Sequence, residues 1–246
     1  MPETFALVRL LNSLFMGVEV KAFQSIGLNA VKAAEMSVKV NQAFALELLV
    51  VAGLIAFFAI VRMTLSVEKP NPGQQIAEMI HEFTGGQADQ VIGHGYETFQ
   101  AFVTCIFLFV LLNNLLGLIP GLETPTKSPW VPLGIAVLTF AYYQLNGLRV
   151  HGFGYIKQFL GPVWWISPLL FPIEIISHCA RVMSLTIRLY ANMFASDLVT
   201  LVFFSLIPLA VPAVFLGLHF FVSLVQAYIF MLLSMIYLSQ AVSHDH

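Results

Sequence analysis

The sequence predicts an all-α, polytopic membrane protein. Of its 246 residues, 59% are hydrophobic and 10% are charged, and the mean hydropathy is +0.85. A soluble domain carries about 25% charged residues, so this composition does not supply a soluble surface. The apolar residues also gather in five long stretches, each close to or above the roughly 20 residues that a membrane-crossing helix needs. Helices are expected because open sheet edges are not satisfied in lipid.

Five membrane-embedded helices are expected from these stretches. They cover residues 43–63, 98–119, 131–148, 163–206 and 213–242. The last two are longer than a perpendicular crossing of a bilayer about 30 Å thick requires, which predicts a long, tilted C-terminal helical hairpin. No internal repeat is visible, so residues 43–246 are interpreted as a single membrane domain.

Two further segments have a different pattern. Residues 1–42 alternate charged and apolar positions and are interpreted as a membrane-surface or extracytoplasmic segment, because a signal peptide would begin with cations and continue without interruption. Residues 74–92 are typical of an interfacial amphipathic helix between the first two spans. The apolar face of this helix would consist of Ile76, Met79, Ile80 and Phe83.

Lysine and arginine positions in the short loops predict the orientation. Arg62 and Lys69 follow the first span, and Arg149 and Lys157 follow the third, which places both loops in the cytoplasm. The N-terminus is then outside and the C-terminus cytoplasmic, although four cations in the N-terminal segment argue for the opposite orientation. Because no mitochondrial or plastid transit signal is present, we expect a bacterial plasma (inner) membrane, while organelle-encoded chains share that pattern.

Several functional classes are disfavoured by the sequence. A formal net charge of −2 offers no basic excess for nucleic acid. Neither a phosphate-binding glycine-rich motif nor a zinc-type cysteine spacing occurs, and we expect no cofactor and no metal in this chain. The remaining alternative is a stand-alone ion channel or secondary transporter. Such transporters typically contain internal repeats with broken helices at matching places.

Most ionisable residues at membrane depth lie on the fourth span. An ionised group near the bilayer centre costs roughly 2.5–3.5 kcal/mol on insertion scales, so each is a functional candidate. At 100° per residue they fall on one stripe of the helix; the stripe consists of Glu174, His178, Arg181, Arg188 and Asn192. Glu174 has an alternative, structural interpretation as a partner of His178 or Arg181 one turn away. Arg188 has no acidic residue one turn from it.

The last two spans form an antiparallel pair whose geometry follows from the numbering. A turn near residues 207–210 means that residues at equal depth have numbers that sum to about 414 to 420. Arg188 is then level with Gln226, and Asp197 lies near the depth of His219. Asp197 is nine residues from Arg188 and points to the opposite side of an ideal helix, which predicts a kink or local unwinding.

Three sequence motifs carry a family resemblance. The stretch SLTIRLYANMFASDL (184–198), with NNLLGLIPG (113–121) before it and LVQAYIFMLLSMIYLS (224–239) after it, resembles subunit a of the F-type ATP synthase. The similarity extends from about residue 75 to the C-terminus, and the motifs keep their order and spacing.

The resemblance implies specific roles for individual residues. The essential arginine of the family falls on Arg188, its nearby asparagine on Asn192, its acid on Asp197 and its glutamine on Gln226. His219 and Glu174 match polar positions that some members use. Aspartate at residue 197 is shorter than the glutamate common in the family.

The resemblance also implies a mechanism and partners. Two half-channels, separated by Arg188, would lead protons to and from a carboxylate on the rotor ring, so that proton flow drives ring rotation and ATP synthesis. Asp197 and His219 would serve the outer half-channel, and Glu174 and His178 the inner one. Partners would be the rotor c-ring subunits, the peripheral-stalk b subunits, other ATP synthase subunits and the lipid bilayer. The chain itself would be a non-catalytic component of the complex.

Overall fold

The computed structural model describes residues 42–119, 124–152, 167–206 and 210–242, and these residues form helices joined by turns. The expected segment at residues 1–42 and the first residues of the span expected from 163 lie almost entirely outside this range. The helices are α3 (Gln42–Met63), α4 (Pro72–Ile92), α5 (Glu97–Leu115), α6 (Trp130–His151), α8 (Ser167–Leu206) and α9 (Ala210–Val242). Two short 3₁₀ turns, η1 (Leu116–Leu118) and η2 (Pro125–Lys127), lie between α5 and α6.

The prediction of an all-α, polytopic membrane protein is confirmed. Within the described residues, five helices are long and apolar enough to cross a membrane. Their apolar segments are Ala43–Met63, Glu97–Leu118, Trp130–Val150, Leu169–Phe203 and Val214–Val242. The expected ends therefore agree with the structure to within a few residues wherever they can be compared.

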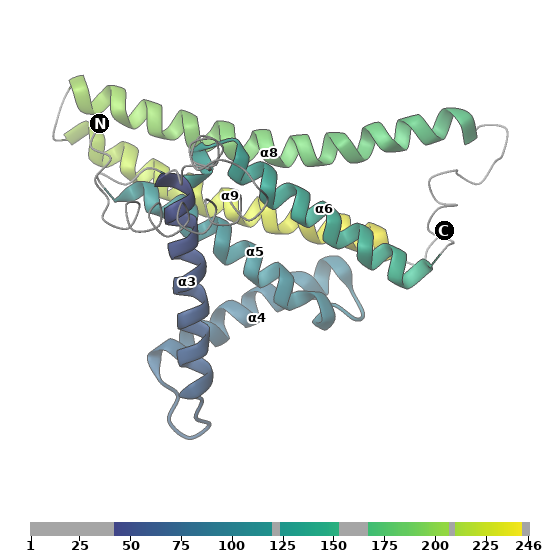
Figure 1. Cartoon of the computed structure of the whole chain (residues 1–246). Helices are drawn as coiled ribbons and strands as arrows, with labels where there is room; N and C mark the ends of the chain where they lie inside the picture. The colour runs from purple at the N-terminus through teal and green to yellow at the C-terminus, as the bar shows by residue number, and fades with distance from the viewer. Residues whose placement is uncertain (1–41, 120–123, 153–166, 207–209, 243–246) are drawn as a thin grey trace, which may run out of the picture.

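The two long helices α8 and α9 lie side by side and run in opposite directions (Figure 1). Helices α5 and α6 pack against this hairpin, with α5 on α9 and with α6 on both α8 and α9. Helix α3 stands crosswise to the hairpin and contacts α4, α5 and η2. The hairpin is thus supported along one side by the remaining helices.

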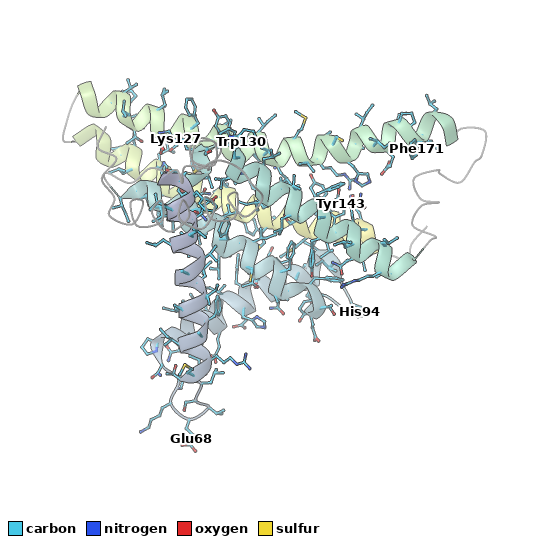
Figure 2. All side chains as sticks on the ribbon, viewed as in Figure 1. Glu68, His94, Lys127, Trp130, Tyr143 and Phe171 are labelled. Atoms are coloured by element: carbon cyan, nitrogen blue, oxygen red, sulfur yellow. The ribbon has the colours of Figure 1, made fainter. Side chains whose placement is uncertain are left out.

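The two connections on either side of α5 that the structure describes lie toward different edges of the molecule. Figure 2 shows Glu68 and His94, from the segment between α3 and α5, toward one edge, and Lys127, just before α6, and Trp130, the first residue of α6, toward the opposite edge. This alternation is what successive membrane crossings require. The orientation that the cation pattern predicts, with the loops after the first and third spans on one side, stays a prediction.

The core is centred where α5, α8 and α9 meet. Its fully buried members include Val110 of α5, Leu189 and Met193 of α8, and Phe230 and Met231 of α9. Because lipid tails are as apolar as these side chains, close packing and hydrogen bonds hold such helices together rather than the hydrophobic effect. The polar contacts between helices are therefore central to the fold.

The helix expected at residues 74–92 is present as α4, but its buried side differs from the one that the sequence pattern indicates. The expected apolar face is largely exposed, with Met79 at 64% and Ile76 at 48%. The buried side is instead a seam of polar and small residues that packs on α5 and α9. Its location at the membrane surface stays a prediction.

Three hydrogen bonds stabilise this seam. The Thr84 and Thr104 hydroxyls lie 2.8 Å apart, Gln100 Nε2 donates to the His81 carbonyl at 2.7 Å, and the Tyr228 hydroxyl donates to Gln87 at 2.9 Å. Each bond joins α4 to a helix of the bundle, so these polar contacts attach α4 to the protein together with the apolar contacts of Ile80 and Phe83.

Two adjacent glycines of α4 provide a test of this seam. A Cβ on Gly85 would lie 2.5 Å from Gln100 Nε2, whereas a Cβ on Gly86 would meet nothing within 4 Å. Alanine is favoured over glycine in a helix by about 1 kcal/mol. We expect Gly86→Ala to raise the free energy of unfolding by this amount. In Gly85→Ala the same gain is cancelled, because the new Cβ displaces the Gln100 hydrogen bond, which is worth about 1 kcal/mol. Denaturant unfolding of the purified chain in detergent measures the difference, and equal stabilities would contradict the seam.

Candidate functional site

Polar residues of α8 and α9 meet at the depths that the numbering predicts. Asn192 contacts Gln226, Ser196 and Asp197 contact His219, and the rings of Phe203 and Phe215 stack. The residue numbers of these pairs sum to between 415 and 418, inside the expected range. The antiparallel geometry of the hairpin is therefore confirmed.

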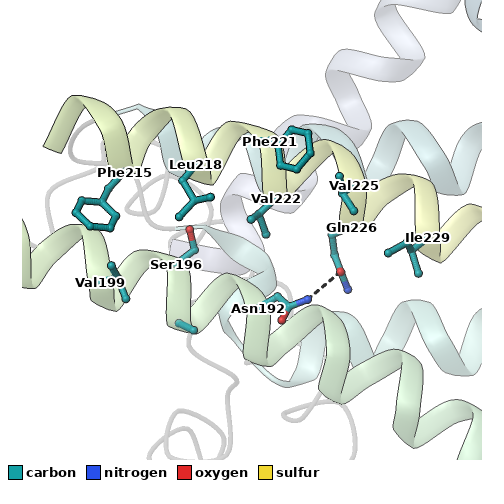
Figure 3. A pocket seen from close by; sticks show the side chains of 11 residues that line it. Asn192, Ser196, Val199, Phe215, Leu218, Phe221, Val222, Val225, Gln226 and Ile229 are labelled. Atoms are coloured by element: carbon teal, nitrogen blue, oxygen red, sulfur yellow. Dashed lines mark hydrogen bonds between the residues drawn. The ribbon is translucent and has the colours of Figure 1, made fainter. Parts of the chain in front are cut away.

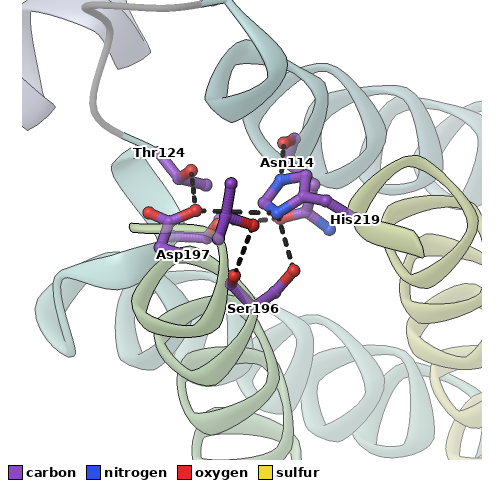
Figure 4. A network of polar contacts seen from close by, with 7 residues as sticks. Asn114, Thr124, Ser196, Asp197 and His219 are labelled. Carbon is purple, nitrogen blue, oxygen red and sulfur yellow. Dashed lines mark hydrogen bonds and ion pairs between the residues drawn. The ribbon is translucent and has the colours of Figure 1, made fainter. Parts of the chain in front are cut away.

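A cluster of polar contacts surrounds His219 in the half of the hairpin nearer its turn (Figure 4). His219 is 2% exposed. Its Nδ1 lies 2.8 Å from the Ser196 hydroxyl and 3.6 Å from Asp197 Oδ1. On the other side of the ring, Nε2 lies 3.3 Å from the backbone carbonyl oxygen of Asn114. The predicted proximity of Asp197 and His219 is thus a direct contact.

These neighbours determine which ring nitrogen carries the proton in the neutral imidazole. A backbone carbonyl oxygen only accepts, so Nε2 must be the donor toward Asn114. Nδ1 is then free to accept from the Ser196 hydroxyl. The same nitrogen faces the Asp197 carboxylate, so a proton that adds to the neutral ring adds at Nδ1, between a hydroxyl and a carboxylate.

The connection between α5 and α6 completes this cluster. Thr124 Oγ1 donates to Asp197 Oδ1 at 3.3 Å, and Thr126 Oγ1 donates to Asn114 Oδ1 at 2.7 Å. Both threonines are buried. Sequence reasoning did not identify Thr124 or Ser196. Ser196 adjoins Asp197, which was an available signal, whereas Thr124 lies 73 residues away in sequence without any periodic pattern.

The local unwinding predicted near Asp197 is absent, and no kink is needed for Asp197 to reach its partners. Helix α8 is continuous from Ser167 to Leu206. Its buried stripe contains Leu185, Leu189 and Met193. At 100° per residue, Arg188 and Asp197 lie on opposite flanks of this stripe. Asp197 therefore reaches His219 and Thr124 from a regular helix, while Arg188 projects from the other flank.

At mid-length, the hairpin contains a second polar contact beside a groove. Asn192 Nδ2 donates to Gln226 Oε1 at 3.0 Å. A groove of about 390 Å³ lies between the two helices, lined by Asn192, Ser196, Gln226 and mostly apolar side chains of α9 (Figure 3). Ser196 therefore connects the His219 cluster with this groove, because its side chain contacts the imidazole and lines the groove.

Arg188 lies one turn from Asn192 and is half-buried. No described residue forms a hydrogen bond or an ion pair with its guanidinium. The expected level partner, Gln226, has its carbonyl oxygen occupied by Asn192. On the same side of α8, Ala191, Asn192 and Ala195 are exposed and small. Arg188 thus presents a charge next to a face that another helix can approach closely.

A third cluster lies toward the other end of α8. His178 Nε2 is 3.4 Å from Glu174 Oε1, and His178 Nδ1 is 2.9 Å from the Tyr143 hydroxyl of α6. Arg181 lies 5.0 Å over the ring of Tyr237. The expected pairing of Glu174 with His178 is therefore present. Tyr143 was not identified from the sequence, because a tyrosine within an apolar span is typical of core packing.

The described residues contain no cluster of three or more His, Cys, Asp or Glu side chains that would hold a metal. The three polar clusters instead lie in sequence along α8. The histidine, aspartate and glutamate side chains of these clusters can exchange protons, since imidazole and carboxylate groups take up and release protons readily.

Comparison with known proteins identifies relatives of this chain. The family described as "ATP synthase A chain" matches residues 44–239. The protein "ATP synthase subunit a" of Koribacter versatilis is 57% identical over 203 residues, covering 82% of this chain and 83% of the relative. The protein of the same name from Solibacter usitatus is 49% identical over 202 residues, covering 82% and 87%. That of Bdellovibrio bacteriovorus is 42% identical over 172 residues, covering 70% and 75%.

The tautomer of His219 is directly measurable. We expect the neutral ring to carry its proton on Nε2, because that nitrogen faces the Asn114 carbonyl. Solid-state nitrogen NMR of the protein with labelled histidine distinguishes the two tautomers, and the signal that disappears in His219→Gln identifies the residue. Ser196→Ala is the matched control and leaves the tautomer unchanged. A neutral His219 protonated on Nδ1 would contradict the assignment.

Proposed function

Because the chain belongs to the ATP synthase subunit a family, we propose that it is the proton-translocating stator, with two half-channels separated by Arg188. As a member of this family it is a multi-pass membrane subunit, and other ATP synthase subunits are its partners. The observation that carries the proposal is the position of Arg188, whose guanidinium has no hydrogen-bond or ion-pair partner among the described residues and lies midway between two ionisable clusters on one helix.

The spacing along α8 supports two separate proton pathways. His178 and Asp197 are 19 residues apart, which corresponds to about 28 Å at 1.5 Å per residue. Arg188 lies about 15 Å from the level of His178 and about 13 Å from that of Asp197. The described contacts of each cluster stay at its own end of the hairpin. A proton therefore has a route at each end and a fixed charge between them.

In the proposed outer pathway, a proton moves from Asp197 to His219 and then toward the groove. Asp197 gives its proton to Nδ1 of the imidazole, which forms an imidazolium while the carboxylate is restored. The Nδ1 proton then passes to the Ser196 hydroxyl, which releases its own proton into the groove. This direction is supported by the contact of Ser196 with His219 and by its place in the groove lining.

The groove and the small-residue face beside Arg188 are the proposed contact surface for the rotor c-ring. A ring carboxylate near Arg188 would be held ionised by its charge. At about 4 Å and an effective dielectric near 20, the attraction is on the order of 4 kcal/mol. This attraction is strong enough to favour the ionised carboxylate while it passes Arg188. A carboxylate that gains a proton in the groove is neutral, is no longer attracted to Arg188 and moves on with the ring.

Arginine suits the barrier role because its guanidinium is not deprotonated in proteins. It therefore never accepts a proton from one pathway and donates it to the other. A lysine ammonium, by contrast, loses its proton readily when desolvated and is a compact point charge without a planar fork. The barrier thus depends on the chemical type of residue 188 as well as on its charge.

The proposed inner pathway uses Glu174, His178 and Tyr143. The carboxylate of Glu174 is 41% exposed, while His178 is buried next to it. An imidazole between a carboxylate and a phenol can take a proton on one nitrogen and release one from the other. These contacts support a route that opens at the Glu174 side of the hairpin.

The proposal includes an orientation and a location. The loop after α3 and that after α6 lie in the cytoplasm, with the N-terminus outside and the C-terminus inside a bacterial plasma membrane. The peripheral-stalk b subunits are the expected partners away from the groove. The exposed apolar face of α4 would lie at the lipid interface on the cytoplasmic side.

The barrier role predicts a specific phenotype for Arg188→Lys. We expect the complex to assemble and ATP-driven proton pumping to fall at least about tenfold, equivalent to 1.4 kcal/mol or more in the barrier. Acidification of inverted membrane vesicles measures pumping, and a blot of the complex measures assembly. Arg62→Lys, at the exposed end of α3, is the matched control and should pump normally. Normal pumping by Arg188→Lys would contradict the barrier.

A further inference from the structure

We infer that Thr124 is a positioning residue for proton transfer, one that holds the Asp197 carboxylate toward His219. The inference rests on the proposed function, because it assigns a role within the outer pathway. Thr124 comes from the connection between α5 and α6 rather than from the hairpin itself. The orientation of the acid would then depend on a segment outside the hairpin, 73 residues earlier in the chain.

The contact geometry supports this role. Thr124 is 2% exposed, and its hydroxyl donates to Asp197 Oδ1 at 3.3 Å. That same oxygen is the one 3.6 Å from His219 Nδ1 (Figure 4). An ionised carboxylate only accepts hydrogen bonds, so Thr124 must be the donor. A donor bound to Oδ1 restricts rotation of the carboxylate and keeps this oxygen directed at the imidazole.

Thr124 is itself held firmly, which a positioning residue requires. Its backbone carbonyl accepts from the Lys127 amide at 3.1 Å, which closes the η2 turn. Two residues along, the buried Thr126 hydroxyl donates to Asn114 of α5 at 2.7 Å. Threonine is also β-branched and therefore has few accessible side-chain rotamers. The turn thus fixes the hydroxyl relative to α5, whose Asn114 carbonyl faces the other side of the imidazole.

Gly117 gives independent support, because it lies against both Thr124 and His219. A Cβ on Gly117 would overlap the Thr124 hydroxyl and lie 3.0 Å from His219 Nε2. The space beside Gly117 is therefore occupied by the hydroxyl that positions the acid and by the imidazole that the acid faces. Glycine is needed here for close approach and not for an unusual backbone angle, since its φ is not in the left-handed region.

The test compares variants of Thr124 in the intact complex. Thr124→Val keeps the shape and removes the hydroxyl, and we expect ATP-driven acidification of inverted vesicles to fall about tenfold with assembly intact. Thr124→Ser restores the hydroxyl and should remain within about twofold of wild type. Thr200→Val is the matched control, because the only hydrogen bond of the Thr200 hydroxyl to a described residue lies within α8, to the Ser196 carbonyl. It should pump at the wild-type rate.

Two further variants test the positioning role in case Thr124→Val does not assemble. Thr124→Cys keeps the volume with a thiol that donates weakly, and it should be as slow as the valine variant. Gly117→Ala should also slow pumping, whereas Gly134→Ala, where a Cβ meets nothing within 4 Å, should not.

The outcomes separate this inference from the proposed function. Wild-type pumping by Thr124→Val or Thr124→Cys, or slow pumping by Thr124→Ser, would overturn the positioning role. Arg188→Lys in the same vesicles tests the function itself. If Arg188→Lys abolishes pumping while Thr124→Val has no effect, only the positioning role fails. If Arg188→Lys pumps normally, the proposed function fails.

Discussion

Carboxylates, imidazoles and amides are costly to place at membrane depth, and the packing of α8 against α9 offsets this cost by giving several of them a polar partner. Asn192 meets Gln226, and Ser196 and Asp197 meet His219. Because lipid offers no alternative hydrogen-bond partner, these contacts constrain the relative position of the two helices. The groove, the clusters and the exposed flank of Arg188 all follow from that alignment.

The surrounding helices act on this hairpin in different ways. Helix α5 contributes the Asn114 carbonyl that sets the tautomer of His219, and the turn after it contributes Thr124. Helix α6 contributes Tyr143 to the cluster at the opposite end. These supports leave the Arg188 flank of α8 uncovered. A charge that remains unpaired within the described chain is what a partner with a passing carboxylate would require.

Much of this arrangement is predictable from the sequence, for identifiable reasons. A bilayer sets a minimum length for a span, so that the five apolar stretches locate the five helices to within a few residues. The constant rise of a helix makes the depth of Asp197 and His219 calculable from residue numbers alone. Depth alone does not determine the partner of Gln226, because a side chain reaches across about one turn, and Asn192 rather than Arg188 contacts it.

Other features carry no local signal. Thr124 lies in a short turn without periodicity, and its contact with Asp197 depends on how α5 and the hairpin pack. Tyr143 has the same pattern as a core aromatic residue. The unwinding expected at Asp197 is absent, and no distortion is needed there, because two residues on opposite flanks of a buried stripe need not point at the same partner. The polar seam of α4 has no signal in the apolar pattern, because the seam lies beside the apolar face, of which Ile76 and Met79 stay exposed.

The central claim is that the charge at residue 188 prevents protons from passing between the two pathways. The most direct measurement is passive proton leakage across vesicles that carry the assembled complex with Arg188→Ala, under an imposed membrane potential and without ATP. The account predicts a leak well above wild type, and its removal when Asp197→Asn is added, since the outer pathway is then interrupted. Vesicles with Arg188→Ala that stay as tight as wild type would contradict the claim.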